Sequence, residues 1–530
     1  MKYTMKTIIK RITLAAACLV GLSSCSDFLT TEPHDFLAPE TFYTNQSNCE
    51  MALAGVYSAL SREAFYGNHY VVELHLGNDH TYYQRGTSNT NTKAPSNSYT
   101  ASYSTLFSTW EVLYKGINNA NMFIENIDAA DIDDEMKTRM KGEARFLRAY
   151  YHWILVQGWH EVPLRKSSFK DVNKSSMPAT SHAEALKWII SEMEECVDLV
   201  DDSAYDKSPS YVKKNTVMGI LARVYLWSAG YPNNGGEADY KKAAYWAGEV
   251  IKSAKHDLNK DYEDLWKKMA SDQYDAKYNE SIWEVEFYGN RNDGNQTMGR
   301  IGNTIGNING GSSYSYGFAA PTLILYDLYE EGDVRRDISI CTYKIASDGV
   351  KQSALKNITQ RNCGKFRREW EDFHGFAPHK NYTSLNWPIL RYSDVLLMLA
   401  EAENEVNGPT TAAYDAINKV RARAGIPALS GLSKEAFRQE VRDERGRELC
   451  FEALHKFDLV RWGTYVKALT TDLGAAIEAG KADKRWSTSN NNMQTPAALV
   501  ANTTEKHQFW PIPEKERAVN TVLEQNQYWR

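Results

Sequence analysis

A cysteine near the N-terminus lies in the sequence context of a covalent lipid modification. Residues 1–11 contain four basic and no acidic side chains, residues 12–20 are mostly apolar, and Leu22-Ser23-Ser24-Cys25 follows. A basic start, an apolar run too short to span a bilayer and small residues before a cleavage point are typical of a secretory signal peptide. The Leu-Ser-Ser-Cys ending resembles a bacterial lipobox, at which the peptide is cleaved before the cysteine and the thiol is acylated.

This pattern predicts a lipoprotein signal peptide at residues 1–24 and a lipid anchor at Cys25. Several acyl chains on one residue hold a protein on a membrane more firmly than a single chain does. We therefore expect a body that is tethered to a membrane face through an extended lead at 25–44. An ordinary signal peptide with a chance cysteine at the cleavage point is the alternative.

Glu444 and Glu448 are the carboxylates whose spacing could suggest catalysis. Glycoside cleavage requires two carboxylates on opposite sides of the scissile bond. Neighbouring acids and bases on a helix, however, more often form a paired or solvated face. We interpret Glu448, together with Arg145, Arg148 and Asp458, as a partner in ion pairs between packed helices, because long charged groups are rarely buried unpaired.

The motifs of other enzyme classes are missing from the sequence. His160-Glu161 lacks the second histidine of a zinc-binding H-E-x-x-H motif, and there is no G-x-S-x-G nucleophile elbow. Residues 299–311 lack the spacing of a dinucleotide-binding loop. We therefore predict no catalytic residue and no cofactor, with a surface glycoside hydrolase as the alternative. The D-x-[DN]-x-[DN]-G calcium loop is also missing, although many loop Asp and Asn residues leave a structural calcium ion open.

The cysteines beyond the leader and the anchor predict no metal site. None forms a C-x-x-C pair, so a structural zinc ion has little support. An odd number at scattered spacing mostly indicates buried free thiols, and Cys341 with Cys363 is the only pair to test for a disulfide, which an exported protein permits. The residues are Cys49, Cys196, Cys341, Cys363 and Cys450.

The charge of the chain excludes one class of partner. The formal net charge is −6, and the sequence contains no basic run and no stripe of interleaved basic and aromatic residues. Nucleic acid is therefore not an expected partner. After the leader, no segment has the roughly twenty apolar residues that a membrane-spanning helix needs.

Helical periodicity dominates two blocks, at about 45–255 and 390–465. The helix pairs, short connectors and small residues of these blocks are similar to tetratricopeptide arrays, but no repeat of about 34 residues is visible. An insert at about 256–390 differs, because short β-like runs such as 282–287 and 338–343 are embedded in Gly, Asn and Ser.

These patterns predict a mainly α fold with a single body at 45–530. Its scaffold is a degenerate tetratricopeptide-like set of helix pairs. The inserted loop-rich, partly β region is expected to carry the ligand site, and residues 466–530 form a C-terminal tail.

Short motifs are spread over nearly the whole chain after the leader. They are Cys25–Leu29 (CSDFL), Glu143–Tyr151 (EARFLRAYY), Val162–Leu164 (VPL), Ala222–Leu226 (ARVYL), Glu280–Glu284 (ESIWE), Arg391–Met398 (RYSDVLLM), Ala400–Glu405 (AEAENE), Asn418–Gly425 (NKVRARAG), Glu444–Leu449 (ERGREL), Phe457–Gly463 (FDLVRWG), Trp510–Pro513 (WPIP) and Gln525-Asn526. In this order they resemble the SusD/RagB family of outer-membrane nutrient-binding lipoproteins.

The resemblance implies binding without catalysis. The protein would be lipid-anchored at the outer membrane, face the cell exterior, bind a glycan and deliver it to a TonB-dependent transporter of the SusC type. A peptide-binding uptake lipoprotein of the RagB type is one alternative, and a scaffold that binds only protein is another.

The resemblance also implies that the helices form the scaffold and that variable loops bind the ligand. Two polar tracts, at 78–103 and 294–317, are such loops here. Sugars present flat apolar faces and rings of hydroxyls, which aromatic rings with a few fixed polar side chains suit. The predicted binding residues are Asp79, Tyr82, Tyr83 and Arg85 in the first tract (with Asn78 and His80 nearby), Asn307, Asn309, Tyr314 and Tyr316 in the second, and Trp370 and His374 in a third loop-like stretch.

Overall fold

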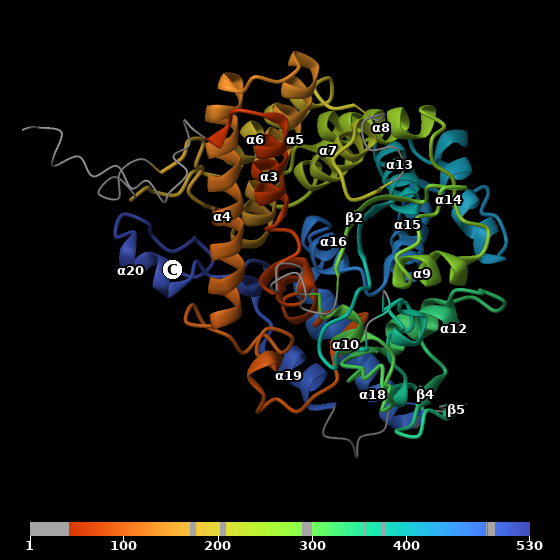
Figure 1. Ribbon diagram of the computed structural model, residues 1–530. Helices are drawn as coiled ribbons and strands as arrows, with labels where there is room; N and C mark the ends of the chain where they lie inside the picture. The colour runs from red at the N-terminus through yellow and green to blue at the C-terminus, as the bar shows by residue number, and fades with distance from the viewer. Residues whose placement is uncertain are drawn as a thin grey trace, which may run out of the picture.

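The computed structural model is mainly helical, as the sequence predicts (Figure 1). It describes residues 42–169, 176–201, 208–288, 299–353, 357–373, 375, 377–483, 485 and 493–530. The predicted signal peptide, the anchor Cys25 and most of the predicted lead lie outside these residues. Among the described helices, none combines the length and apolar character that crossing a bilayer requires.

The first block consists of helices that pack against their neighbours in the chain. Local capping explains several of their starts, because a side-chain oxygen satisfies an unpaired amide of the first turn. Ser181 accepts from the amide of Glu184, and the Glu184 carboxylate accepts in turn from the Ser181 hydroxyl at 2.7 Å. The helices are α3 (Gln46–Tyr57), α4 (Ser104–Asn126), α5 (Asp134–Trp159), α6 (His182–Cys196), α7 (Lys214–Ala229) and α8 (Gly236–Lys252).

The second block packs onto the first through α13, which contacts α8, α14 and α15. Gly425 ends α14 in the left-handed conformation, with φ of +77°, where glycine has no steric penalty. Ser433 caps α15 through the amide of Ala436 at 3.2 Å. The helices of this block are α13 (Tyr392–Asn407), α14 (Thr411–Ala424), α15 (Lys434–Leu449) and α16 (His455–Arg461). This packing of helix pairs is consistent with a tetratricopeptide-like scaffold.

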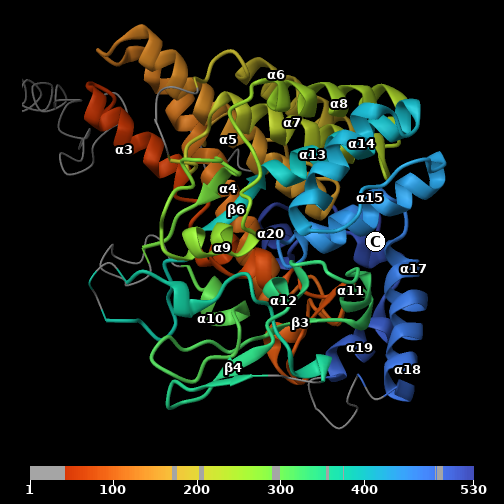
Figure 2. The same cartoon turned by 90° about the vertical axis from the view of Figure 1, so that its right-hand side faces the viewer.

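Much of the insert, including α10, α12 and β4, lies with α18 and α19 below the two helical blocks in both views (Figures 1 and 2). The described part of the insert contains short helices and strands of three two-stranded antiparallel sheets, one of which is completed by β1 from the first polar tract. Its elements are α9 (Tyr262–Ala270), β2 (Ser281–Val285) with β6 (Trp387–Arg391), α10 (Ile301–Ile305), β3 (Ala319–Pro321) with β1 (Thr81–Tyr83), α11 (Leu323–Leu328), α12 (Arg336–Ser339), and β4 (Tyr343–Ile345) with β5 (Lys351–Ser353). The C-terminal segment adds α17 (Tyr465–Lys467), α18 (Leu473–Asp483), α19 (Gln494–Asn502) and α20 (Glu514–Val519).

The two predicted β-like runs behave differently. The run 282–287 contributes to strand β2, as expected. The run 338–343 instead begins in helix α12 and reaches a strand only at Tyr343. Cys341 and Cys363 are both buried free thiols. The disulfide that the sequence analysis left open between them is therefore not formed.

The charged residues that the sequence analysis interpreted as structural form ion pairs between helices. Arg145 and Arg148 of α5 share Glu192 of α6, with N–O distances of 2.8 and 2.6 Å. Asp458 pairs with Arg445 at 3.0 Å. These contacts confirm the interpretation of Arg145, Arg148 and Asp458 as structural partners.

Glu448 lies at the centre of the most buried of these clusters and is fully buried itself. Its carboxylate is 2.6 Å from Arg423, 2.9 Å from Arg391 and 3.0 Å from Arg335. Burial raises the pKa of Glu448, but the three arginines outweigh burial and lower the pKa below its usual value. Glu448 is therefore a charged structural group.

Replacing Glu448 with Gln is expected to destabilise the fold strongly. It removes the shared negative charge and leaves the three guanidinium groups partly uncompensated in the interior, which costs about 3 kcal/mol in the free energy of unfolding. Chemical denaturation measures this change. The matched control on the same helix is Glu440→Gln, because Glu440 is 35% exposed and lies 3.6 Å from Arg447. A loss at Glu448 no larger than that at Glu440 would contradict the proposed role.

Candidate functional site

Pairing of β1 with β3 brings the two predicted loop tracts together. Tyr83 is opposite Ala319 in this sheet, so the ring of Tyr83 stacks on Phe318 with ring centroids 5.0 Å apart. Phe318 stacks on Tyr316 at 4.8 Å with an angle of 7° between the rings, and Tyr314 meets Tyr316 edge-on at 4.9 Å. We call Tyr83, Phe318, Tyr316 and Tyr314 the aromatic row. Tyr83 is buried, whereas the other three rings are half-buried.

Backbone hydrogen bonds hold the aromatic row against the insert. The amides of Tyr316 and Phe318 donate to the carbonyls of Asn303 and Thr304, both at 2.8 Å. On the other side, the amide of Gln84 donates to the carbonyl of Phe318 at 2.7 Å. The rings are therefore positioned by α10 and by strand pairing, and not by their own packing alone.

A buried arginine fixes the outer end of the aromatic row. Arg368 is fully buried, and its guanidinium donates to the carbonyls of Tyr314 at 2.7 Å and Lys380 at 3.1 Å. Glu371 balances its charge at 2.8 Å. Arg368 thus holds the backbone of Tyr314 next to the loop that carries Lys380.

Polar groups surround the exposed side of the aromatic row. The guanidinium of Arg85 lies 5.1 Å from the ring centroid of Phe318, and the ammonium of Lys380 lies 5.0 Å from that of Tyr314. The amide of Asn91 donates to the Tyr83 hydroxyl at 2.8 Å. Within the described part of the chain, the hydroxyls of Tyr314 and Tyr316 have no hydrogen-bond partner, so they are available to a ligand.

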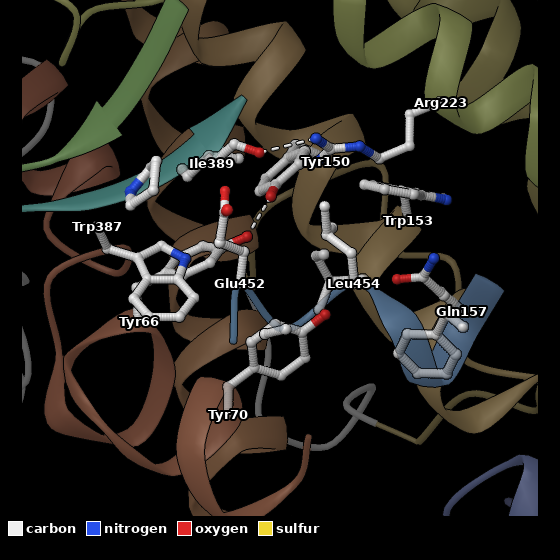
Figure 3. Close-up of a pocket in the computed structure, with 14 residues that line it drawn as sticks. Tyr66, Tyr70, Tyr150, Trp153, Gln157, Arg223, Trp387, Ile389, Glu452 and Leu454 are labelled. Carbon is white, nitrogen blue, oxygen red and sulfur yellow. Dashed lines mark hydrogen bonds between the residues drawn. The ribbon is translucent and has the colours of Figure 1, made fainter. Parts of the chain in front are cut away.

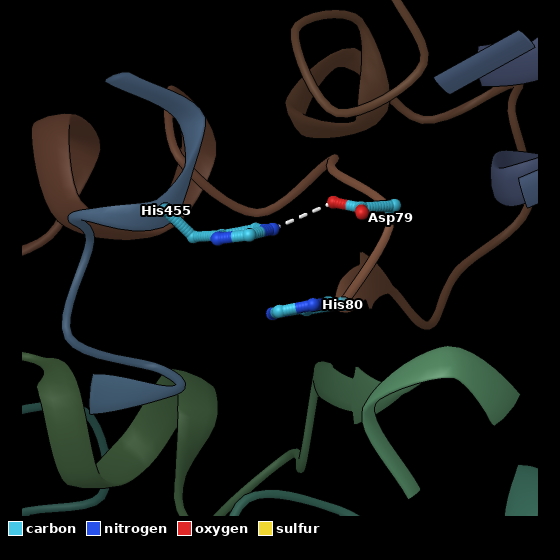
Figure 4. A group of neighbouring side chains, drawn as sticks. All are labelled: Asp79, His80 and His455. Carbon is cyan, nitrogen blue, oxygen red and sulfur yellow. Dashed lines mark hydrogen bonds and ion pairs between the residues drawn. The ribbon is translucent and has the colours of Figure 1, made fainter. Parts of the chain in front are cut away.

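Asp79 and Tyr82 of the first tract point into the protein. Tyr82 is fully buried and Asp79 is 7% exposed. The Asp79 carboxylate accepts from the Nε2 of His455 at 2.7 Å, and the ring of His80 stacks on that of His455 at 3.6 Å (Figure 4). A ligand could reach these two residues only by displacing the packing around them. Their burial does not support the predicted direct binding role.

Burial raises the pKa of Asp79, but His455 and His80 outweigh burial and lower the pKa to about 2. Asp79, His80 and His455 offer possible metal-ligand atoms within 4.8 Å of one another. The two imidazole planes are parallel within 7°, so their in-plane lone pairs do not converge on one ion in this arrangement. We interpret the three residues as a carboxylate–imidazole hydrogen bond with a stacked ring, which ties the start of β1 to the start of α16.

The remaining predicted residues differ in position. Asn307 and Asn309 are buried, and the Asn309 side chain accepts from the amide of Gly311 at 2.9 Å. Asn309 therefore shapes the turn before the aromatic row, and burial argues against ligand contact for both asparagines. Trp370 packs against Arg367, 4.6 Å from its ring centroid, and has no ring contact with the aromatic row among the described residues. His374 lies outside the described residues.

Sequence reasoning missed Phe318, Lys380 and Arg368. Tyr314, Tyr316 and Phe318 alternate along the chain, and alternate residues of an extended segment lie on one face. This spacing could have revealed Phe318. No local pattern indicated Arg368 or Lys380, because their partners are about 54 and 66 residues away in the chain.

A cavity of about 30 Å³ lies between the buried side chains of Tyr66, Tyr70, Tyr150 and Trp387 (Figure 3). The hydroxyls of Tyr66 and Tyr150 hydrogen-bond to each other beside it. Such a volume holds one or two water molecules, which is too small for a sugar ring. This cavity is therefore an internal void and not a ligand site.

A larger groove of about 910 Å³ runs between α3, α5 and β2. Met51, Tyr57, Tyr211 and Glu284 are among its lining residues, and no ring of the aromatic row is. Burial raises the pKa of Glu284 to about 7, although the amide of Asn386 donates to it at 3.1 Å. This carboxyl is thus neutral over much of the acidic range in the folded protein.

The raised pKa of Glu284 predicts a pH-dependent effect on stability. A carboxyl with a folded pKa of about 7 and an unfolded pKa near 4.5 stabilises the fold below pH 4.5, and this contribution is lost as the pH rises to 7. Glu284→Gln removes the titration. We expect the variant to gain up to about 3 kcal/mol over the natural protein between pH 4.5 and pH 8. Denaturation curves across this range test it, and an equal pH-dependent gain from Glu286→Gln would contradict it.

Two family models match this chain. A model described as SusD family matches residues 342–529, and one described as starch-binding associating with outer membrane matches residues 27–226. Over these two segments the chain is similar to the SusD family. The first match includes the helices of the second block, and the second includes helices α3 to α6, most of α7 and strand β1.

Known relatives match along the length of the chain. SusD-like protein P25 of Formosa agariphila is 25% identical, over 98% of this chain and 98% of its own. The starch-binding protein SusD of Bacteroides thetaiotaomicron is 23% identical, over 66% of this chain and 68% of its own. A crystal structure of a SusD homologue from Bacteroides thetaiotaomicron superposes with a TM-score of 0.82 at 28% identity, over 92% of this chain and 98% of that one. These SusD-like relatives are named for family or for binding, and not for a reaction.

Proposed function

We propose that this protein binds an oligosaccharide or polysaccharide at the aromatic row without cleaving it. The observation that carries the proposal is the pairing of β1 with β3, which assembles rings from two distant loops on one surface. The matches to SusD-type family models support it, and one relative is named a starch-binding protein. In this proposal the ligand then passes to a TonB-dependent outer-membrane transporter of the SusC type.

The chemistry of the aromatic row suits a carbohydrate. Sugar rings have apolar faces that pack on aromatic surfaces, while their hydroxyls need fixed donors and acceptors. The row supplies half-buried rings from Tyr314, Tyr316 and Phe318, and the two tyrosine hydroxyls are available beside them. Because Arg368 and α10 fix the backbone, little ordering is needed when the ligand binds, which favours affinity.

The place of action follows from the family and from the N-terminal sequence. One matching family model is described as associating with the outer membrane. We propose that acylation of Cys25 anchors the chain there and that the body faces the cell exterior. In this position the aromatic row would meet glycans before the transporter does.

Removal of the two half-buried tyrosines of the aromatic row tests the site. The double variant Tyr314→Ala with Tyr316→Ala is expected to lower glycan affinity at least about ten-fold, because stacking and hydroxyl contacts are lost together. A glycan array followed by calorimetry measures it. Both rings are half-buried, so the melting temperature should change little, whereas Tyr83→Ala would destabilise the buried end of the row.

The matched control is Tyr245→Ala, since Tyr245 is an exposed tyrosine on α8 with 53% of its surface accessible. Equal glycan affinity in the double variant and in this control would place the ligand elsewhere. Binding of peptides and not of glycans would favour the peptide-uptake alternative.

Incubation with polysaccharides tests the absence of catalysis. We expect the purified protein to release no reducing ends over several hours. The spacing of Glu444 and Glu448 could suggest catalysis, but both carboxylates are buried in contact with Arg335 and are not accessible to a substrate. Sustained release of reducing ends that is lost on removal of one carboxylate would overturn the binding proposal.

A further inference from the structure

Two cations flank the aromatic row. Arg85 lies over Phe318 at one end and Lys380 over Tyr314 at the other, at 5.1 and 5.0 Å from the ring centroids. Arg85 is half-buried and Lys380 is exposed. Their charges therefore lie beside the same rings that the proposed function assigns to the ligand.

Neither cation has a carboxylate within ion-pair distance among the described residues. The side chain of Arg85 donates to the neutral amide oxygen of Asn91 at 3.4 Å, a long contact. Other arginines of the surrounding insert are compensated. Arg300 pairs with Glu63 at 2.7 Å, Arg368 with Glu371 at 2.8 Å and Arg361 with Asp337 at 3.4 Å.

The uncompensated positive charge of Arg85 and Lys380 contrasts with the acidic character of the whole chain, whose net charge is −6. A neutral glycan gains little from two cations, since its hydroxyls are equally well served by amides and hydroxyls. An anionic glycan gains charge-assisted hydrogen bonds, which are about twice as strong as neutral ones. Cations are also needed to hold a polyanion near a protein that otherwise repels it.

We propose that the ligand of the aromatic row is an anionic glycan, whose carboxylate or sulfate groups bind Arg85 and Lys380. This inference rests on the proposed function. The sugar rings pack against Tyr314, Tyr316 and Phe318, and the anionic substituents of successive residues reach the cations at the two ends. Uronate and sulfate share the chemistry that these side chains recognise.

Matched pairs of polysaccharides that differ in charge test the inference. One pair is polygalacturonate with its fully methyl-esterified form, and the other is chondroitin sulfate with chondroitin freed of sulfate. Calorimetry at low salt is expected to give an affinity at least about ten-fold higher for the more highly charged member of one pair. The preference should shrink at 0.5 M NaCl, where ions screen exposed charges. The pair that shows it distinguishes uronate from sulfate recognition.

Charge-removing variants locate the effect. Arg85→Gln and Lys380→Gln are each expected to lower affinity for the charged polysaccharide about ten-fold, with Arg85→Lys retaining part of it. Lys380 is exposed, so its variant folds even where Arg85→Gln perturbs the loop. Lys252→Gln is the matched control, because Lys252 is an exposed lysine at the end of α8.

The outcomes separate this inference from the proposed function. Equal or tighter binding of neutral glycans, or a preference for charge that Lys380→Gln and Lys252→Gln reduce equally, would overturn the anionic assignment and leave glycan binding intact. No binding of any glycan, neutral or charged, would overturn both. A salt-sensitive preference that is lost in Lys380→Gln and kept in Lys252→Gln supports it.

Discussion

The buried ion pairs around Glu448 are the interaction on which the rest of the structure depends. Its carboxylate meets Arg423 of α14, Arg391 at the end of β6 and Arg335 beside α12. One group of α15 therefore joins the second helical block to the loop-rich insert. Because a buried charge without a partner costs several kcal/mol, each element has a defined place relative to the others. Apolar packing alone would allow the insert more freedom, since it is not directional.

Because the insert is held in a defined position, the loops that carry the aromatic row are ordered before a ligand binds. The aromatic row comes from β1, which belongs to the first half of the chain, and from the segment that leads into β3. Arg368 and α10 hold this segment by backbone contacts, so the rings do not have to be ordered by the ligand. Half-buried rings beside two cations that have no ion-pair partner among the described residues suit the binding role proposed here. The groove along α3 and α5 is larger, but none of the rings of the aromatic row lines it. Its lining includes methionines and Glu284, the carboxyl with the raised pKa.

The site residues show where reasoning from sequence works and where it fails. Tyr83, Arg85, Tyr314 and Tyr316 were chosen as ring-bearing or charged residues of polar loops, and the structure brings them together, although Tyr83 is as buried as Tyr82. Asp79, Tyr82, Asn307 and Asn309 were chosen on the same grounds and are buried. Neighbours in a strand point to opposite sides, so Tyr82 faces the core while Tyr83 joins the row. Composition cannot distinguish the two.

By itself the sequence determined the mainly helical class, the two helical blocks and the structural role of Arg145, Arg148, Glu448 and Asp458. The helical blocks depend on periodicity, which local sequence encodes, and the role of the charges follows from the cost of burying a long charged group without a partner. Only the tertiary structure decided which loops meet, because the pairing of Tyr83 with the strand after Phe318 joins residues more than two hundred positions apart. It also decided which charges are left without partners, since compensation depends on distances in space that no spacing along the chain reveals.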